Sequence, residues 1–254
     1  MDLSHDFLFR MLLYHTMSQR PLIGITVDTS DNADTFESPM NYAKAVEMAG
    51  GLPLLIPYNL DHSLIPQLVD HLDGILFTGG NDLDPALYDQ TWHPKAEHVD
   101  LNRQNFELAL MKEVESRRLP ALGVCMGSQL MNVYRGGSLH QFLPDVNRPE
   151  ALEHRKVEGN ILRHPVAIDM HSHLGAAIGK DQISANTYHK QAVDRIGNGL
   201  KIIATAPDGV IEGFEDPTFP LFAAVQWHPE RLTNEPEHLA PFQLLVEKSR
   251  RSVR

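Results

Sequence analysis

The sequence predicts an α/β fold: a three-layer α/β/α domain with a central, mostly parallel sheet and an antiparallel extension in its second half. In the first half, short apolar runs alternate with stretches of helical apolar spacing. This alternation is typical of parallel strands joined by right-handed helical crossovers. From about residue 166 the segments become short and alternating, and Asp208-Gly209 is a hairpin signal between two of them.

Length, charge and cysteine content narrow the class of protein. The chain has 254 residues and a net charge of −11, and no Lys/Arg stripe offsets that charge, so we expect no nucleic-acid partner. The single cysteine excludes an internal disulfide and fits a reducing compartment, so we expect a cytoplasmic protein. No apolar run reaches the length of a membrane span, so we expect no membrane partner.

Residues 1–20 are predicted to be an amphipathic extension of a single domain that spans residues 21–254. Apolar residues fall at helical spacing there, and Ser4 is available as a cap. Asp2, Asp6 and Arg10 interrupt any secretory core. We expect this helix to pack on the domain or on a second subunit, which makes a homodimer possible.

The elements follow in order along the chain. A buried strand is predicted at 22–27, before a polar loop, and a helix over 42–49 ends at Gly50-Gly51. The later elements are strands at 54–56, 74–78 and 119–124, helices over 64–72, 106–114 and 126–135, shorter strands at 166–168, 183–185, 201–205, 209–214 and 222–226, and a C-terminal helix over 239–246.

The stretch Gly123-Val124-Cys125-Met126-Gly127 joins a buried strand to a helix. Glycine on both sides lets strand and helix approach closely, which is the geometry of a nucleophile elbow with cysteine as the nucleophile. At a helix N-terminus the thiolate, the reactive form of cysteine, is favoured. The alternative is a small buried cysteine without a chemical role; the paired glycines and the strand-to-helix switch favour the elbow.

A second glycine pair, Gly79-Gly80, follows the predicted strand at 74–78. Such a backbone can present N–H groups to a developing oxyanion, although the pair taken alone favours an ordinary glycine turn. The loop from Asn81 to about Val99 is long, and loops of that length tend to be functional.

His228 is the predicted base for Cys125. It precedes Pro229, which disfavours a helical backbone. In an extended chain, side chains two residues apart point the same way, so Glu230 should accept a hydrogen bond from the His228 ring. Nucleophile, base and orienting carboxylate together have the general form of a triad.

Taken together, these motifs resemble the class I glutamine amidotransferase superfamily, which implies a flavodoxin-like domain of that type. Within it, the chain is most similar to the peptidase C26 group, especially the γ-glutamyl-γ-aminobutyrate hydrolases. The resemblance covers nearly the whole chain from Pro21. It rests on Gly-Val-Cys-Met-Gly-Ser-Gln and Trp-His-Pro-Glu, supported by the segments at 77–82, 102–107, 136–141, 186–191 and 206–212.

The resemblance implies a role for each matching residue. Cys125 would be the nucleophile, His228 the general base and acid, and Glu230 its orienter. The backbone N–H groups of Gly80 and Met126 would form the oxyanion hole. Many relatives carry arginine where this chain has Met126, a change that keeps the backbone donor but loses the arginine side chain. The γ-glutamyl pocket would be bordered by Gln129, Tyr188 and His189.

We therefore expect a cysteine hydrolase that takes a small-molecule γ-glutamyl amide and needs no cofactor. Two alternatives are a glutaminase subunit that passes ammonia to a synthase partner and a catalytically idle, ligand-binding relative. The third and most remote is a metal hydrolase that uses the histidines. His171-Ser172-His173 could suggest a metal site, but no clear third and fourth ligand accompany the pair, so we expect a solvated loop and no metal.

Overall fold

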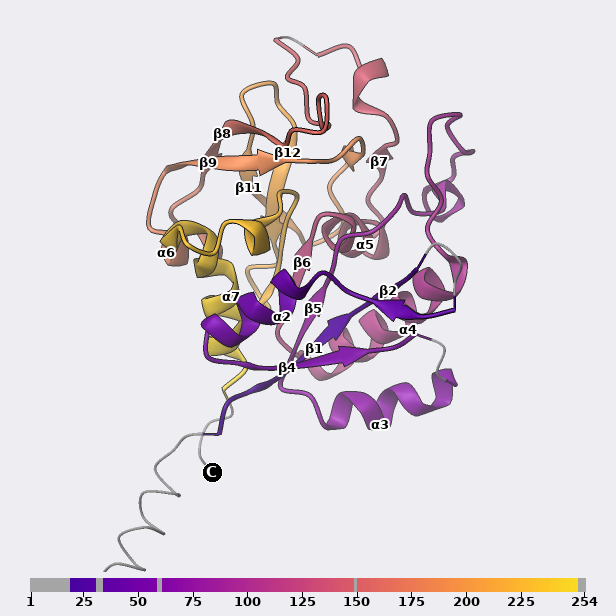
Figure 1. The fold of residues 1–254 in the computed structure, drawn as a ribbon, viewed down its shortest axis with the longest axis vertical. Helices are drawn as coiled ribbons and strands as arrows, with labels where there is room; N and C mark the ends of the chain where they lie inside the picture. Colours follow the sequence, from indigo (N-terminus) through magenta and orange to yellow (C-terminus); the bar gives the residue numbers. More distant parts are fainter. Residues whose placement is uncertain (1–18, 31–33, 59–60, 149, 251–254) are drawn as a thin grey trace, which may run out of the picture.

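The computed structural model describes residues 19–30, 34–58, 61–148 and 150–250. Most of the predicted N-terminal extension, residues 1–18, therefore lies outside the described residues. Two short strands, β2 (Asp28–Thr29) and β3 (Phe36–Glu37), form a separate antiparallel pair. All other described strands belong to one mixed sheet (Figure 1).

One half of the large sheet is parallel. Its strand order is β4 (Leu52–Ile56), β1 (Leu22–Thr26), β5 (Gly74–Phe77), β6 (Ala121–Val124) and β13 (Phe222–Val225). Strands β1, β5, β6 and β13 are short, apolar and largely buried, as expected for strands covered on both faces. The edge strand β4 is also apolar but exposes Leu52, Leu54 and Leu55. The predicted parallel core is confirmed.

The other half is antiparallel, as predicted. The order continues through β12 (Ile211–Glu215), β11 (Lys201–Thr205), β8 (Leu162–Ile168) and β9 (Gln182–Thr187). The short strands β7 (Leu139–His140) and β10 (Ala192–Val193) pair with each other, and β10 also pairs with β12. The Asp208-Gly209 turn joins β11 to β12, and Gly209 has a positive φ of 84°.

Helices cover both faces of the sheet (Figure 1). Apolar side chains of α2 (Met40–Met48), α6 (His173–Ile178) and α7 (Pro236–Lys248) share one core cluster. Those of α3 (Ile65–Asp70), α4 (Leu101–Arg117) and α5 (Met126–Tyr134) share the other. Four 3₁₀ turns complete the elements of the described residues: η1 (His62–Leu64), η2 (Pro85–Tyr88), η3 (Leu143–Asp145) and η4 (Pro229–Arg231). No helix of the described chain has the length and apolar character to cross a membrane.

Alternate residues of the central strands divide between these two clusters. In β6, Val124 belongs to the cluster with α7, whereas Ala121 belongs to the cluster with α4. This alternation is the period of a strand. Since β6 and β13 are adjacent and parallel, with Val124 opposite Val225, the residues that follow both strands emerge at the same edge of the sheet.

Candidate active site

Cys125 lies at the turn between β6 and α5, as predicted. It is the N-cap residue of α5, with φ 53° and ψ −110°, a conformation that costs a non-glycine residue roughly 1–3 kcal/mol. Its N–H donates to the carbonyl oxygen of Val225, with an N–O distance of 2.9 Å. The surrounding packing therefore holds the only cysteine of the chain in a strained backbone at the end of a strand.

Both glycines of the elbow are required by close packing. A Cβ on Gly127 would lie 2.3 Å from the carbonyl oxygen of Phe77, and a Cβ on Gly123 would lie 2.8 Å from that of Gly127. Neither distance is possible for a real side chain. The absence of Cβ atoms thus allows α5 to begin directly against β5 and β6.

His228 and Glu230 form the predicted contact. The distance from His228 Nδ1 to Glu230 Oε1 is 2.8 Å, and both side chains are buried. The backbone of His228 is non-helical, with φ −107° and ψ 78°. Glu230, however, lies in the 3₁₀ turn η4 and not in an extended chain, because Pro229 begins that turn directly after His228. The turn, not strand periodicity, brings the carboxylate to the ring.

Asn186, at the end of β9, fixes the backbone of His228 in both directions. Its Nδ2 donates to the His228 carbonyl oxygen, and its Oδ1 accepts from the His228 N–H, both at 2.9 Å. This contact was not predicted from the sequence. The only signal was that Asn186 begins the Asn-Thr-Tyr-His segment.

The charges of the site raise the pKa of His228. Burial lowers it, but the negative charges of Cys125 and Glu230 outweigh burial and raise the pKa to about 10. Nε2, the second ring nitrogen, is buried and has no hydrogen-bond partner among the described residues. Cys125 nevertheless lies close enough for its charge to act on the ring, and Gly79 is beside both side chains. A His228 imidazolium beside a Cys125 thiolate is the arrangement that activates a cysteine nucleophile.

The Gly79-Gly80 segment lies against this pair. A Cβ on Gly79 would be 3.2 Å from His228 Cε1 and 3.5 Å from Cys125 Cβ, so Gly79 sits beside both. Among the described residues, the N–H groups of Gly80 and Met126 donate no hydrogen bond. Two free backbone donors next to Cys125 are groups of the kind that can stabilise an oxyanion.

Arg103 of α4, whose site role was not predicted, anchors this glycine segment. Its guanidinium is fully buried and donates to the carbonyl oxygen of Gly79 at 2.9 Å and to Thr78 Oγ1 at 3.0 Å. It also pairs with Glu107 at 2.8 Å and Asp28 at 2.6 Å. Burial lowers the pKa of Arg103, but these two carboxylates outweigh burial and raise it. Arg103 is therefore a buried cation that fixes the backbone beside Cys125.

The three predicted substrate-binding residues differ in their surroundings. The ring of Tyr188 is 5.9 Å from that of His228, and the residue is 39% exposed. Gln129 is buried, and its Nε2 donates to the Gln191 carbonyl oxygen and to Gln226 Oε1, both at 3.1 Å. The side chain of His189 is also buried and faces Glu212. Tyr188 thus lies beside His228, whereas the other two make contacts within the protein.

The solvated loop expected at His171-Ser172-His173 is instead the start of the helix α6, because Ser172 caps that helix. Ser172 is the N-cap of α6 and accepts from the Gly175 N–H, while the N–H of His173 donates to Glu215. Among the described residues, the group that could hold a metal ion lies elsewhere, at His154, His189 and Glu212.

Comparison with known proteins shows which family the sequence matches. A family model described as Peptidase C26 matches residues 21–230. A Mycobacterium tuberculosis protein named "Putative glutamine amidotransferase Rv2859c" is 36% identical over 237 residues, which cover 91% of this chain and 75% of that protein. The γ-glutamyl-γ-aminobutyrate hydrolase PuuD of Escherichia coli K12 is 33% identical over 203 residues, which cover 76% of this chain and 78% of the hydrolase.

A solved structure shares the fold. The glutaminase domain of Trypanosoma brucei CTPS, with bound acivicin, superposes with a TM-score of 0.60 at 16% identity. The superposition covers 89% of this chain and 94% of that domain. The domain architecture is therefore that of class I glutamine amidotransferases, as the motifs predicted.

Proposed function

This chain belongs to the peptidase C26 family, and from that premise we propose that it is a free-standing cysteine hydrolase of γ-glutamyl amides. The observation that carries the proposal is the coupling of Cys125 to the His228–Glu230 pair. The contact from His228 Nδ1 to Glu230 Oε1 orients the ring and leaves Nε2 for the thiol and the leaving group. This division of the two ring nitrogens is what a triad requires.

The proposed reaction proceeds in two steps. The Cys125 thiolate attacks the γ-carbonyl carbon, and the backbone N–H groups of Gly80 and Met126 stabilise the oxyanion. His228 Nε2 then gives its proton to the departing amine, the C–N bond breaks, and a γ-glutamyl thioester remains. In the second step His228 takes a proton from water, the hydroxide displaces the sulfur, and glutamate is released.

The substrate class rests on the relatives and on the surroundings of Tyr188. One relative is named a γ-glutamyl-γ-aminobutyrate hydrolase, and a γ-glutamyl amine is the substrate class we propose. Tyr188 combines an accessible ring beside His228 with a cation, because Lys156 Nζ lies 4.0 Å from the ring centroid. A carboxylate-bearing leaving group would find both an apolar surface and a positive charge there.

The second candidate is a glutaminase that delivers ammonia to a synthase. It is favoured by the relative named as a glutamine amidotransferase and by the fold shared with a glutaminase domain. Both candidates would use the same nucleophile and base, so only the leaving group and the need for a partner separate them.

A hydrolysis panel tests the proposal. Purified protein is assayed alone with γ-glutamyl-γ-aminobutyrate, other γ-glutamyl amines, γ-glutamyl peptides, glutamine and an α-linked glutamyl dipeptide, and Cys125→Ala serves as the matched control. We expect a γ-glutamyl amine to have a kcat/KM at least tenfold above that of glutamine. Only the larger substrate fills both the γ-glutamyl pocket and the leaving-group side at Tyr188 in the transition state. A preference for glutamine would replace this proposal with the glutaminase. Efficient cleavage of the α-linked dipeptide would remove the γ-glutamyl assignment.

A further inference from the structure

Three histidines surround the carboxylate of Glu212, away from the catalytic triad. Glu212 Oε1 is 3.6 Å from His154 Nδ1, 3.5 Å from His164 Nε2 and 3.6 Å from His189 Nε2. All four side chains are at least 95% buried. Different segments supply them: the loop before β8, β8 itself, the turn after β9, and β12.

These distances exceed those of hydrogen bonds. A charge-assisted contact between a ring nitrogen and a carboxylate is expected near 2.8 Å, the distance that the His228–Glu230 pair shows. Within the described chain, His164 Nε2, His189 Nε2 and both Glu212 oxygens have no hydrogen-bond partner. If one ring shared a proton with Glu212, its nitrogen would lie nearer to the carboxylate oxygen than the other two do. Instead, all three nitrogen–oxygen distances are 3.5–3.6 Å.

The outward contacts of the rings fix where their hydrogens lie. His189 Nδ1 faces the Gln191 carbonyl oxygen at 2.9 Å, and His164 Nδ1 faces the Pro165 carbonyl oxygen at 3.1 Å. Because a carbonyl oxygen only accepts, both Nδ1 atoms carry the hydrogen. In the neutral rings, the Nε2 atoms that face Glu212 therefore present lone pairs.

His154 follows the same pattern through Asp208. Its Nε2 lies 3.1 Å from Asp208 Oδ2, an acceptor, so the hydrogen is on Nε2. Its Nδ1 therefore faces Glu212 Oε1, at 3.6 Å, and the Thr187 hydroxyl oxygen, at 3.1 Å. The Thr187 hydroxyl is the competing partner of this nitrogen, but it already donates to the His154 carbonyl oxygen, at 3.0 Å.

Ligand atoms of His154, His189 and Glu212 thus lie within 4.8 Å of one another in a buried site. His164 Nε2 lies 3.5 Å from the same Glu212 oxygen, as a fourth candidate ligand. We propose that this cluster binds a divalent cation of the zinc class through His154 Nδ1, His164 Nε2, His189 Nε2 and Glu212 Oε1. Zinc prefers four such ligands in tetrahedral geometry at about 2.0–2.1 Å, which places neighbouring ligand atoms about 3.3 Å apart. The outer contacts of the rings, with a carboxylate and two carbonyl oxygens, are those that orient histidine ligands.

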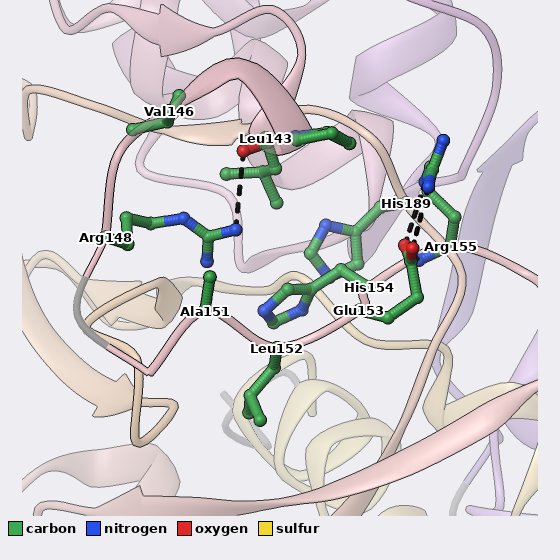
Figure 2. A pocket seen from close by; sticks show the side chains of 10 residues that line it. Leu143, Val146, Arg148, Ala151, Leu152, Glu153, His154, Arg155 and His189 are labelled. Carbon is green, nitrogen blue, oxygen red and sulfur yellow. Dashed lines mark hydrogen bonds and ion pairs between the residues drawn. The ribbon is translucent and has the colours of Figure 1, made fainter.

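A cavity of about 80 Å³ lies against this cluster. Figure 2 shows the rings of His154 and His189 beside it, and Arg148, Glu153 and Arg155 also line it. The volume is several times what one water molecule occupies, so a hydrated ion has a route to the ligands. No triad residue lines this cavity.

The proposed ion has a positioning role and not a catalytic one. It would join the turn after β9 to β8 and β12, and that turn carries Tyr188 directly before His189. Because Tyr188 lies beside His228, a bound ion would hold the wall of the substrate site in place.

Metal analysis of the full chain tests this site without an activity assay. The chain is purified without a polyhistidine tag, stripped with a chelator, dialysed against zinc and analysed by mass spectrometry for metal content. We expect about one zinc per wild-type chain and a rise in Tm on zinc addition. Glu212→Gln and His164→Gln should each lower the bound zinc at least tenfold. The matched control is a double variant, His171→Gln with His173→Gln, which should keep the ion.

Cobalt keeps the test decisive if the buried variants do not fold. Co²⁺ added to the stripped wild-type chain should give the intense visible absorption of a tetrahedral site. A wild-type chain that holds less than about one-tenth of a zinc, or weak absorption typical of octahedral cobalt, would overturn the proposal. Equal zinc content in folded Glu212→Gln and wild type would overturn it as well, because the ion would then lie on other histidines.

Discussion

The hydroxyl of Tyr42 accepts a hydrogen bond from the backbone N–H of Gly79, with an oxygen–nitrogen distance of 3.0 Å. Tyr42 is buried in α2, and burial, together with the charges of Glu230 and Cys125, raises its pKa well above the usual value. The hydroxyl therefore stays neutral and ties the glycine segment to the helix on the opposite side from Arg103.

Tyr42→Phe should lower kcat with little change in KM. The variant leaves the Gly79 N–H without its partner, which costs roughly 1–3 kcal/mol and loosens the backbone of Gly80. Steady-state kinetics and denaturant unfolding measure the two effects. Tyr134→Phe is the matched control, because its hydroxyl bonds to Glu115 at 2.9 Å, outside the site. An equal loss of kcat in both variants would mean that Tyr42 acts only through general stability.

Arg103→Met should destabilise the protein by about 3–5 kcal/mol, because it leaves Glu107 as a buried, uncompensated charge. Arg103→Lys should destabilise less but still lower kcat, since an ammonium cannot reproduce the planar fork that reaches Gly79 and Thr78. Denaturant unfolding and kinetics measure both. Arg117→Met, at a more exposed ion pair with Asp70, should cost less than about 1 kcal/mol. A kcat in Arg103→Lys equal to that of the wild type would show that the charge alone suffices.

Cys125→Gly should be at least as stable as Cys125→Ala, although neither variant has a nucleophile. The positive φ at this position strains alanine by roughly 1–3 kcal/mol, while the greater flexibility of glycine in the unfolded chain offsets about 0.5–1 kcal/mol. Thermal unfolding of the two variants shows which of them is more stable. In α4, where the backbone is helical, Ala109→Gly should instead lose about 1 kcal/mol. A Cys125→Gly variant clearly less stable than Cys125→Ala would contradict a strained elbow.

The raised pKa of His228 makes its contribution to stability depend on pH. In the unfolded chain the pKa is about 6.5, and in the folded chain it is about 10. Protonation thus favours the folded state: the contribution is fully present below about pH 6.5 and is lost as the pH rises toward 10. The difference in unfolding free energy between wild type and His228→Ala should therefore shrink from pH 7 to pH 10. A difference that stays constant or grows would show that His228 is not held as an imidazolium.

The sequence predicted the parts of the site that are local in the chain. The glycines around Cys125 and the two-residue spacing of His228 and Glu230 predicted the elbow and the ring–carboxylate contact, although a 3₁₀ turn makes that contact. No local sequence pattern predicted the contacts between segments that are distant in the chain. Arg103 reaches Asp28 across 75 residues, and His154, in the loop before β8, meets His189 after β9 and Glu212 of β12. Spacing along the chain says nothing of such meetings, because tertiary packing decides them.

Trapping the covalent intermediate tests the central claim most directly. The wild-type protein is mixed with γ-glutamyl-γ-aminobutyrate, quenched in acid during turnover, digested and analysed by mass spectrometry. A γ-glutamyl thioester on the peptide that contains Cys125, absent from Cys125→Ala, is the result that the proposed mechanism predicts. Continued release of glutamate by Cys125→Ala, or turnover by the wild type with the adduct on another residue, would contradict it.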